Sequence, residues 1–173
     1  MSGSVQCSKP TKSEIGLWGE DLAAEHLKRS GYVILGRRVR PDLHDEIDII
    51  AQKKDILVFV EVKTRVSEAF GRPAAAVGRA KRKALCRAAA SYLRRVKYPL
   101  SVYRFDVIEV VGNPDKPKSP EIRHIEDAFR FPARYRFSRE REKSKIIDFN
   151  RFFSQLIRLA RLLPFAFKLS RRK

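Results

Sequence analysis

The hydrophobic pattern of this chain centres on an apolar run over residues 56–60 that leads directly into Glu61 and Lys63. A strand with no polar side chain on either face is typical of the middle of a sheet that is covered on both sides. Because side chains alternate along a strand, Glu61 and Lys63 are expected on one face, with Cα atoms about 7 Å apart. The pattern therefore predicts a buried central strand over residues 56–63 that ends in charge.

The remaining periodicity predicts an α/β arrangement around this strand. Thr11 and Glu14 have the spacing of a capping box, which begins a helix that Gly31 ends. Further elements are expected as strands over 32–35, 46–51 and 102–111, a long helix over 74–95 and a short element over 121–127. The polar link over 52–55 favours an antiparallel hairpin. This order of one helix, three strands, a second helix and a further strand predicts an α/β fold, with a central mixed sheet flanked by helices.

Two more acidic residues lie where this pattern buries side chains. Asp48 is in the middle of the apolar strand 46–51, and Glu20 is on the apolar face of the first helix. Carboxylates from adjacent strands make a hard oxygen site suited to Mg²⁺ or Mn²⁺, and the Lys63 ammonium can stabilise a phosphate or position a water. The structural alternatives are that Glu61 simply pairs with Lys63, that Asp48 pairs with an arginine, and that Glu20 reaches solvent at the edge of its stripe.

Basic residues strongly outnumber acidic ones. The chain has 38 Lys and Arg against 20 Asp and Glu, a net charge of +18 and a pI near 10.4. Such a charge indicates a polyanionic partner. The long helix over 74–95 carries almost only basic charges, which is typical of a phosphate contact surface, the alternative being an ordinary solvated face.

The composition changes near residue 131. Residues 1–130 have a net charge of +8, whereas residues 131–173 have +10 and predict a basic amphipathic helix that breaks at Pro164. This tail is expected to pack on the core, dock a protein partner, extend a nucleic-acid surface or lie on an anionic membrane, and the first two roles are preferred. The predicted organisation is a disordered arm over 1–13, a domain over 14–130 and the tail.

Cysteine usage and hydropathy favour a cytoplasmic protein. Cys7 and Cys86 are far apart and belong to no CxxC motif, which argues against a disulfide framework or a zinc site and predicts reduced thiols. Residues 1–12 have no apolar signal region, and no stretch approaches 18 consecutive apolar residues. We therefore expect neither secretion nor a transmembrane segment.

Several short segments occur in an order and at spacings that resemble a known protein family. They are Gly19-Glu20 within 16–27, the segments 31–35, 46–51 and 59–65, Gly71-x-Pro73, Lys81 and the segment 104–107. Together they resemble the YraN family of small bacterial proteins over about residues 14–130. That family is similar to archaeal Holliday junction resolvases and, more distantly, to the restriction-endonuclease-like PD-(D/E)xK nucleases.

The resemblance implies a restriction-endonuclease-like αβββαβ core with a divalent-metal nuclease site. Carried over by position, its catalytic residues are Glu20, Asp48, Glu61 and Lys63. Asp48, Glu61 and the backbone carbonyl of Val62 are expected to hold Mg²⁺ or Mn²⁺. The implied activity is hydrolysis of DNA phosphodiesters, on branched or recombining DNA.

A set of basic residues is expected to hold the DNA backbone without reading its sequence. These residues are Arg37, Arg38, Arg40, Arg65 and Lys81. A homodimer would supply two sites for cutting two strands symmetrically. The alternative function is a non-catalytic DNA-binding accessory protein that keeps the nuclease-like fold.

The chain departs from the family pattern at two positions near the expected site. Asp45 stands where the family usually has Gly, and Arg38 stands near a usual Asn. Strand alternation is expected to turn Asp45 away from the face that holds Asp48. Glu46 shares the face of Asp48 and could serve a second metal, but pairing with an arginine is the preferred interpretation.

Overall fold

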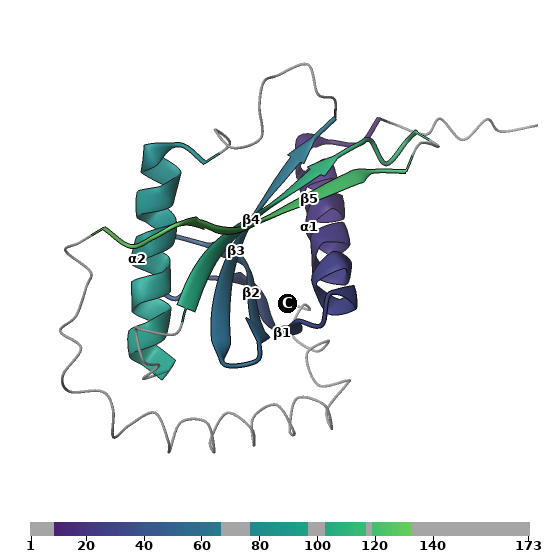
Figure 1. Cartoon of the computed structure of the whole chain (residues 1–173). Helices are drawn as coiled ribbons and strands as arrows, with labels where there is room; N and C mark the ends of the chain where they lie inside the picture. Colours follow the sequence, from purple (N-terminus) through teal and green to yellow (C-terminus); the bar gives the residue numbers. More distant parts are fainter. Residues whose placement is uncertain (1–8, 67–76, 97–102, 117–118, 133–173) are drawn as a thin grey trace, which may run out of the picture.

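The computed structural model describes residues 9–66, 77–96, 103–116 and 119–132. Within these residues the chain forms a five-stranded mixed sheet between two helices (Figure 1). In chain order the elements are α1 (Lys12–Arg29), β1 (Val33–Val39), β2 (Ile47–Lys53), β3 (Ile56–Arg65), α2 (Arg79–Val96), β4 (Tyr103–Val111) and β5 (Glu121–Phe129). The α/β fold and the order of the αβββαβ core are confirmed, and the short element predicted over 121–127 is a fifth strand.

The sheet has its strands in the order β1-β2-β3-β4-β5. The β1/β2, β2/β3 and β4/β5 pairs are antiparallel, whereas β3 and β4 are parallel and are connected through α2. The hairpin predicted from the link over 52–55 is therefore confirmed. Because β3 lies between β2 and β4, it is the central strand.

Two apolar layers sandwich the sheet. α1 covers the face that includes Val58 and Val60, and α2 covers the face that includes Leu57 and Phe59 (Figure 1). All four of these β3 side chains are fully buried, which confirms the central strand. Ile56, at the hairpin end of the strand, is the exception in the apolar run, with 38% of its surface exposed.

The N-terminal helix begins and packs as its sequence indicates. Thr11 and Glu14 form the expected capping box. Farther along α1, Gly19 lies directly against β3, where a Cβ would overlap the Thr64 hydroxyl oxygen. The missing side chain therefore lets α1 approach the end of β3 closely, and the next residue, Glu20, is held near that end.

The first strand is longer than the sequence predicted. The prediction ended it at residue 35 and placed Arg37 and Arg38 in a connection, but β1 continues to Val39 and pairs there with Ile47. β1 lies at the edge of the sheet, and both arginine side chains are exposed while the backbone pairs with β2.

Parts of the sequence interpretation fall at the borders of the described residues. α2 begins at Arg79, and the earlier start predicted at 74–76 lies outside these residues. Phe131, which we placed at the start of the tail, is buried against Tyr103 and Phe105, so the core extends to it. Of the arm predicted over 1–13, residues 1–8 with Cys7 lie outside the described part, as do residues 133–173, whereas residues 12 and 13 already belong to α1. In the described part neither helix has the length and apolarity needed to cross a membrane.

Candidate active site

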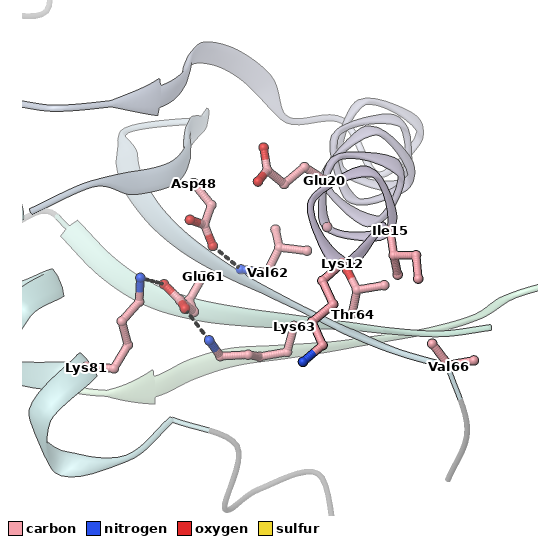
Figure 2. Close-up of a pocket in the computed structure, with 11 residues that line it drawn as sticks. Lys12, Ile15, Glu20, Asp48, Glu61, Val62, Lys63, Thr64, Val66 and Lys81 are labelled. Carbon is pink, nitrogen blue, oxygen red and sulfur yellow. Dashed lines mark hydrogen bonds and ion pairs between the residues drawn. The ribbon is translucent and has the colours of Figure 1, made fainter. Parts of the chain in front are cut away.

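A cavity of about 460 Å³ opens at the end of β3, between α1 and the beginning of α2 (Figure 2). Its walls come from five parts of the fold. The lining residues are Lys12, Ile15, Gly16, Glu20, Asp48, Glu61, Val62, Lys63, Thr64, Val66 and Lys81. The structure thus brings all four predicted catalytic residues to one cavity, together with Val62 and Lys81.

Asp48 is held by the backbone of the neighbouring strand. The regular pairing of β2 with β3 extends to Ile49 and Val60, and beyond that point Asp48 Oδ2 accepts a hydrogen bond of 2.7 Å from the Val62 N–H. The carboxylate therefore takes the place of a strand carbonyl where the ladder ends. Burial and the negative charge of Glu61 raise the pKa of Asp48 to about 6, against the opposing effects of the Val62 hydrogen bond and Lys81.

Glu61 is a buried carboxylate between two ammonium groups. Its side chain is 1% exposed; Lys63 Nζ lies 2.6 Å from Oε1 and Lys81 Nζ lies 3.1 Å from Oε2 (Figure 2). Each Glu61 oxygen therefore has one ammonium group against it. Burial lowers the pKa of Lys81, but the carboxylates of Glu61 and Asp48 outweigh it and raise this pKa overall.

Glu20 reaches the cavity from α1, on the other side of the sheet from α2. In Figure 2 it lies with Asp48 above Glu61 and its two lysines. Its Oε2 atom is buried without a hydrogen-bond partner and is 4.0 Å from the Arg37 guanidinium. Burial raises the pKa of Glu20, although Arg38 and Arg37 oppose this. The solvent-edge alternative is wrong, because only 14% of the side chain is exposed.

The donor atoms fit a hard divalent cation. Asp48 and Glu61 supply carboxylate oxygens on adjacent strands, and both Glu61 oxygens are ion-paired with lysine ammonium groups. Among the described residues, no three His, Cys, Asp or Glu side chains are gathered closely enough to enclose a metal ion. Mg²⁺ commonly uses one or two carboxylates and takes its other ligands from water and substrate phosphate, so a two-carboxylate set suffices. Metal binding stays a prediction.

The arginines of β1 and the following residue are paired with nearby acids. Arg37 lies 2.7 Å from Asp21 and Arg40 lies 2.7 Å from Glu46. Arg38 contacts the other Glu46 oxygen at 3.4 Å. Pairing of Glu46 with arginines is therefore confirmed. Contact of the three arginines with DNA stays a prediction. To bind a phosphate, each arginine would have to contact it in addition to its carboxylate partner or release that partner.

The remaining two predicted phosphate ligands lie close to the cavity. Arg65 is the last residue of β3, and its carbonyl accepts a hydrogen bond of 2.8 Å from the Gly112 N–H. Lys81 lines the cavity and forms an ion pair with the Glu61 carboxylate. Sequence reasoning placed Lys81 on the DNA and did not anticipate this pairing.

The two departures from the family pattern differ in how well they suit the local structure. Asp45 accepts two hydrogen bonds from Arg87 of α2, at 2.9 and 3.0 Å, which directs its carboxylate away from the cavity as expected. Arg38 has a φ of 51°, in the left-handed region that Asn adopts more readily than Arg. The arginine therefore carries a small backbone cost.

Sequence reasoning missed two residues near this site. Lys12 lines the cavity from the first turn of α1, and no sequence signal distinguishes it from other surface lysines. Glu109 is 1% exposed in β4, beside Lys63 in the sheet. It interrupts the apolar run 107–111, which is the same signal that identified Glu61, so the sequence could have revealed it.

Comparison with known proteins agrees with the resemblance found in the sequence. The pattern of the Uncharacterised protein family UPF0102 matches residues 19–110, which include Glu20, Asp48, Glu61 and Lys63. The chain is 45% identical to a UPF0102 protein of Caldicellulosiruptor saccharolyticus, over 68% of this chain and 98% of that one. A Syntrophotalea carbinolica relative is 44% identical over 66% and 90%, and one from Symbiobacterium thermophilum is 48% identical over 58% and 85%. The chain belongs to the UPF0102 family.

Proposed function

We propose that this protein is a nucleic-acid-binding endonuclease that hydrolyses DNA phosphodiesters with Mg²⁺ or Mn²⁺. The observation that carries the proposal is the convergence of Asp48, Glu61 and Lys63 in one cavity, with Asp48 fixed by the Val62 N–H at 2.7 Å. Buried carboxylates on a central strand cost several kcal/mol unless a partner compensates them. Their collection at one open end of the sheet supports a functional explanation.

Each residue has a role that follows from its position. Asp48 and Glu61, with the Val62 carbonyl, would hold the cation, which when bound would neutralise charge on the scissile phosphate and activate a water. Lys63 would orient the attacking water and stabilise the extra negative charge of the transition state. Glu20, whose buried Oε2 lacks a hydrogen-bond partner, would bind the cation through a water molecule or orient the attacking water.

The charge of the chain supports DNA as the substrate. A net charge of +18 favours any polyanion, and phosphate contacts supply most of the affinity of sequence-independent binding. Lysines surround the acidic groups of the cavity, and Lys12, Lys63 and Lys81 all line it. A strand drawn to these ammonium groups would place a phosphate beside the carboxylates. We favour branched or recombining DNA, on the resemblance to junction resolvases.

One observation favours a second candidate, a DNA-binding protein that does not cut. Lys63 and Lys81 lie against separate oxygens of Glu61 at 2.6 and 3.1 Å, so the carboxylate is already neutralised without a metal. A protein that has lost catalysis could keep Glu61 and its two lysines as a structural ion-pair cluster. A metal must displace at least one ammonium group before Glu61 can act as a ligand.

Cleavage assays with and without Mn²⁺ distinguish the two candidates. Purified protein is incubated with linear, nicked, flapped and four-way DNA, alongside Asp48→Asn, which keeps an oxygen that can accept the Val62 N–H. The nuclease proposal expects Mn²⁺-dependent cutting of at least one substrate and none by the variant, while both bind DNA. Binding by both with no cutting of any substrate would support the non-catalytic candidate.

A further inference from the structure

Three charged side chains are buried among the described residues, and they differ in how their charge is satisfied. They are Glu61, Asp106 and Glu109. Asp106 accepts hydrogen bonds from Arg104 and from the Asp127 N–H at 3.0 and 3.1 Å, and a His124 ring nitrogen lies 2.8 Å away. A carboxylate with this many partners is explained by structure alone.

Glu109 is the buried carboxylate that remains unexplained. Its side chain is 1% exposed, and its Oε1 atom is buried with no hydrogen-bond partner. A buried acceptor without a partner costs about 1–3 kcal/mol, and more when it carries charge. Neutral residues of similar size would avoid that cost, so a carboxylate at this position calls for a role beyond packing.

The sheet register places Glu109 beside the catalytic lysine. Lys63 of β3 is directly opposite Glu109 of β4 in the parallel ladder. Neighbouring strands are about 4.8 Å apart, and opposed residues project to the same face. The flexible stem of Lys63 can therefore bring its ammonium to Glu109 or to Glu61, where it lies now at 2.6 Å.

We propose that Glu109 is a positioning residue that receives the Lys63 ammonium when Glu61 takes up a divalent cation. The inference rests on the proposed function. An ammonium group and a divalent cation repel each other at the same carboxylate, so a cation bound at Glu61 Oε1 requires Lys63 to leave that oxygen, whereas Lys81 lies against Oε2. Glu109 offers it an unused buried acceptor one strand away, which keeps the amine beside the cavity.

A second carboxylate within reach of Lys63 is expected to favour metal binding at Glu61. Without it, Lys63 would have to move from a buried carboxylate into solvent or stay and compete with the cation. With it, the ammonium exchanges one carboxylate for another. Partners that orient metal-site residues in this way typically change metal affinity by about 10–100-fold.

Mn²⁺ affinity, measured by calorimetry on the full chain, tests the proposal through a double-mutant cycle. The variants are Glu109→Gln, Lys63→Met and the two combined, with Glu121→Gln on β5 as a matched loss of one negative charge. We expect Glu109→Gln to weaken Mn²⁺ binding about 10-fold in the wild-type background. It should have little effect once Lys63 is methionine, because the ammonium that Glu109 is proposed to receive is then absent, while Lys81 is the same in both backgrounds. Thermal melting checks that each variant folds.

Two results would overturn this inference while the proposed function stands. In one, wild type and Glu109→Gln bind Mn²⁺ equally well. In the other, Glu109→Gln weakens binding equally with and without Lys63, as a simple loss of charge would. If wild type itself bound no Mn²⁺, the inference and the proposed function would both fail. Glu121→Gln is expected to bind Mn²⁺ as wild type does.

Discussion

The Asp48 carboxylate accepts the backbone N–H of Val62 at 2.7 Å, just beyond the last regular pair between β2 and β3. This bond ties an acidic side chain of one strand to the main chain of the next, between Glu61 and Lys63. The position of Asp48 is therefore set by the sheet and does not depend on a bound ligand. Two carboxylates are held close together, and this proximity has measurable consequences for pH dependence.

The raised pKa of Asp48 predicts how stability depends on pH. Its pKa is about 6 in the folded protein against an ordinary 3.8. The folded state therefore binds the proton more tightly, and the resulting stabilisation is present below about pH 4 and is lost as pH rises through 6. Relative to Asp48→Asn, we expect the metal-free wild type to lose about 2–3 kcal/mol of unfolding free energy between pH 4 and pH 7. Urea unfolding in chelator measures this, and parallel pH profiles would contradict it.

Loss of the central carboxylate should separate DNA binding from cleavage. In Glu61→Gln the ammonium groups of Lys63 and Lys81 lose their shared partner, and both are about one-third exposed. We expect a loss of about 1–2 kcal/mol of stability, because solvent partly compensates the lysines. DNA affinity should stay or rise, since a charge that repels phosphate is removed, while cleavage disappears. Fluorescence anisotropy with labelled DNA measures the affinity, and a large loss of binding would contradict the expectation.

The close approach of α1 to β3 can be tested with two glycines of the same helix. A Cβ at Gly19 would overlap the Thr64 hydroxyl, whereas one at Gly16 has no atom within 4 Å. Gly19→Ala is expected to lower the unfolding free energy by about 1–3 kcal/mol through overpacking, and to weaken Mn²⁺ binding by displacing Glu20. Gly16→Ala should raise stability by about 0.5–1 kcal/mol through helix propensity. Equal effects of the two substitutions in denaturation experiments would argue against this packing.

The charge of the C-terminal tail predicts a strong effect on salt dependence. Residues 133–173 hold 13 basic and 3 acidic groups. If these cations contact phosphate, deletion of the segment should reduce the slope of log affinity against log salt by several units. Electrophoretic titrations of DNA between 50 and 200 mM salt measure the slope. An unchanged slope would leave packing on the core, a protein partner or an anionic membrane as the role of the tail, and vesicle binding would test the membrane.

Much of the arrangement of the candidate site could be predicted from local sequence. Strand alternation places Glu61 and Lys63 on one face, and helical spacing places Glu20 on the buried face of α1. Asp48 was found because a carboxylate interrupts an apolar strand. These inferences succeed because burial of an ion is costly, so its occurrence in an apolar segment is informative.

The contacts that the sequence did not reveal depend on distant parts of the chain. Lys81 reaches Glu61 because the crossover through α2 brings its first turn to the end of β3. Glu109 lies beside Lys63 because of the parallel register, which no local pattern specifies. The arginines near the end of β1 appeared available for DNA in the sequence, but the fold pairs them with Asp21 and Glu46.

The central claim is tested most directly by the single-turnover cleavage rate of wild type and Lys63→Ala in Mn²⁺. The matched control is Lys53→Ala, because Lys53 lies over the Tyr32 ring and does not line the cavity. We expect wild type and the control to cut the preferred substrate at similar rates, and Lys63→Ala to be slower by about 100-fold or more. Equal rates for wild type and Lys63→Ala, or no cutting by wild type on any substrate, would contradict the assignment of this cavity as a nuclease site.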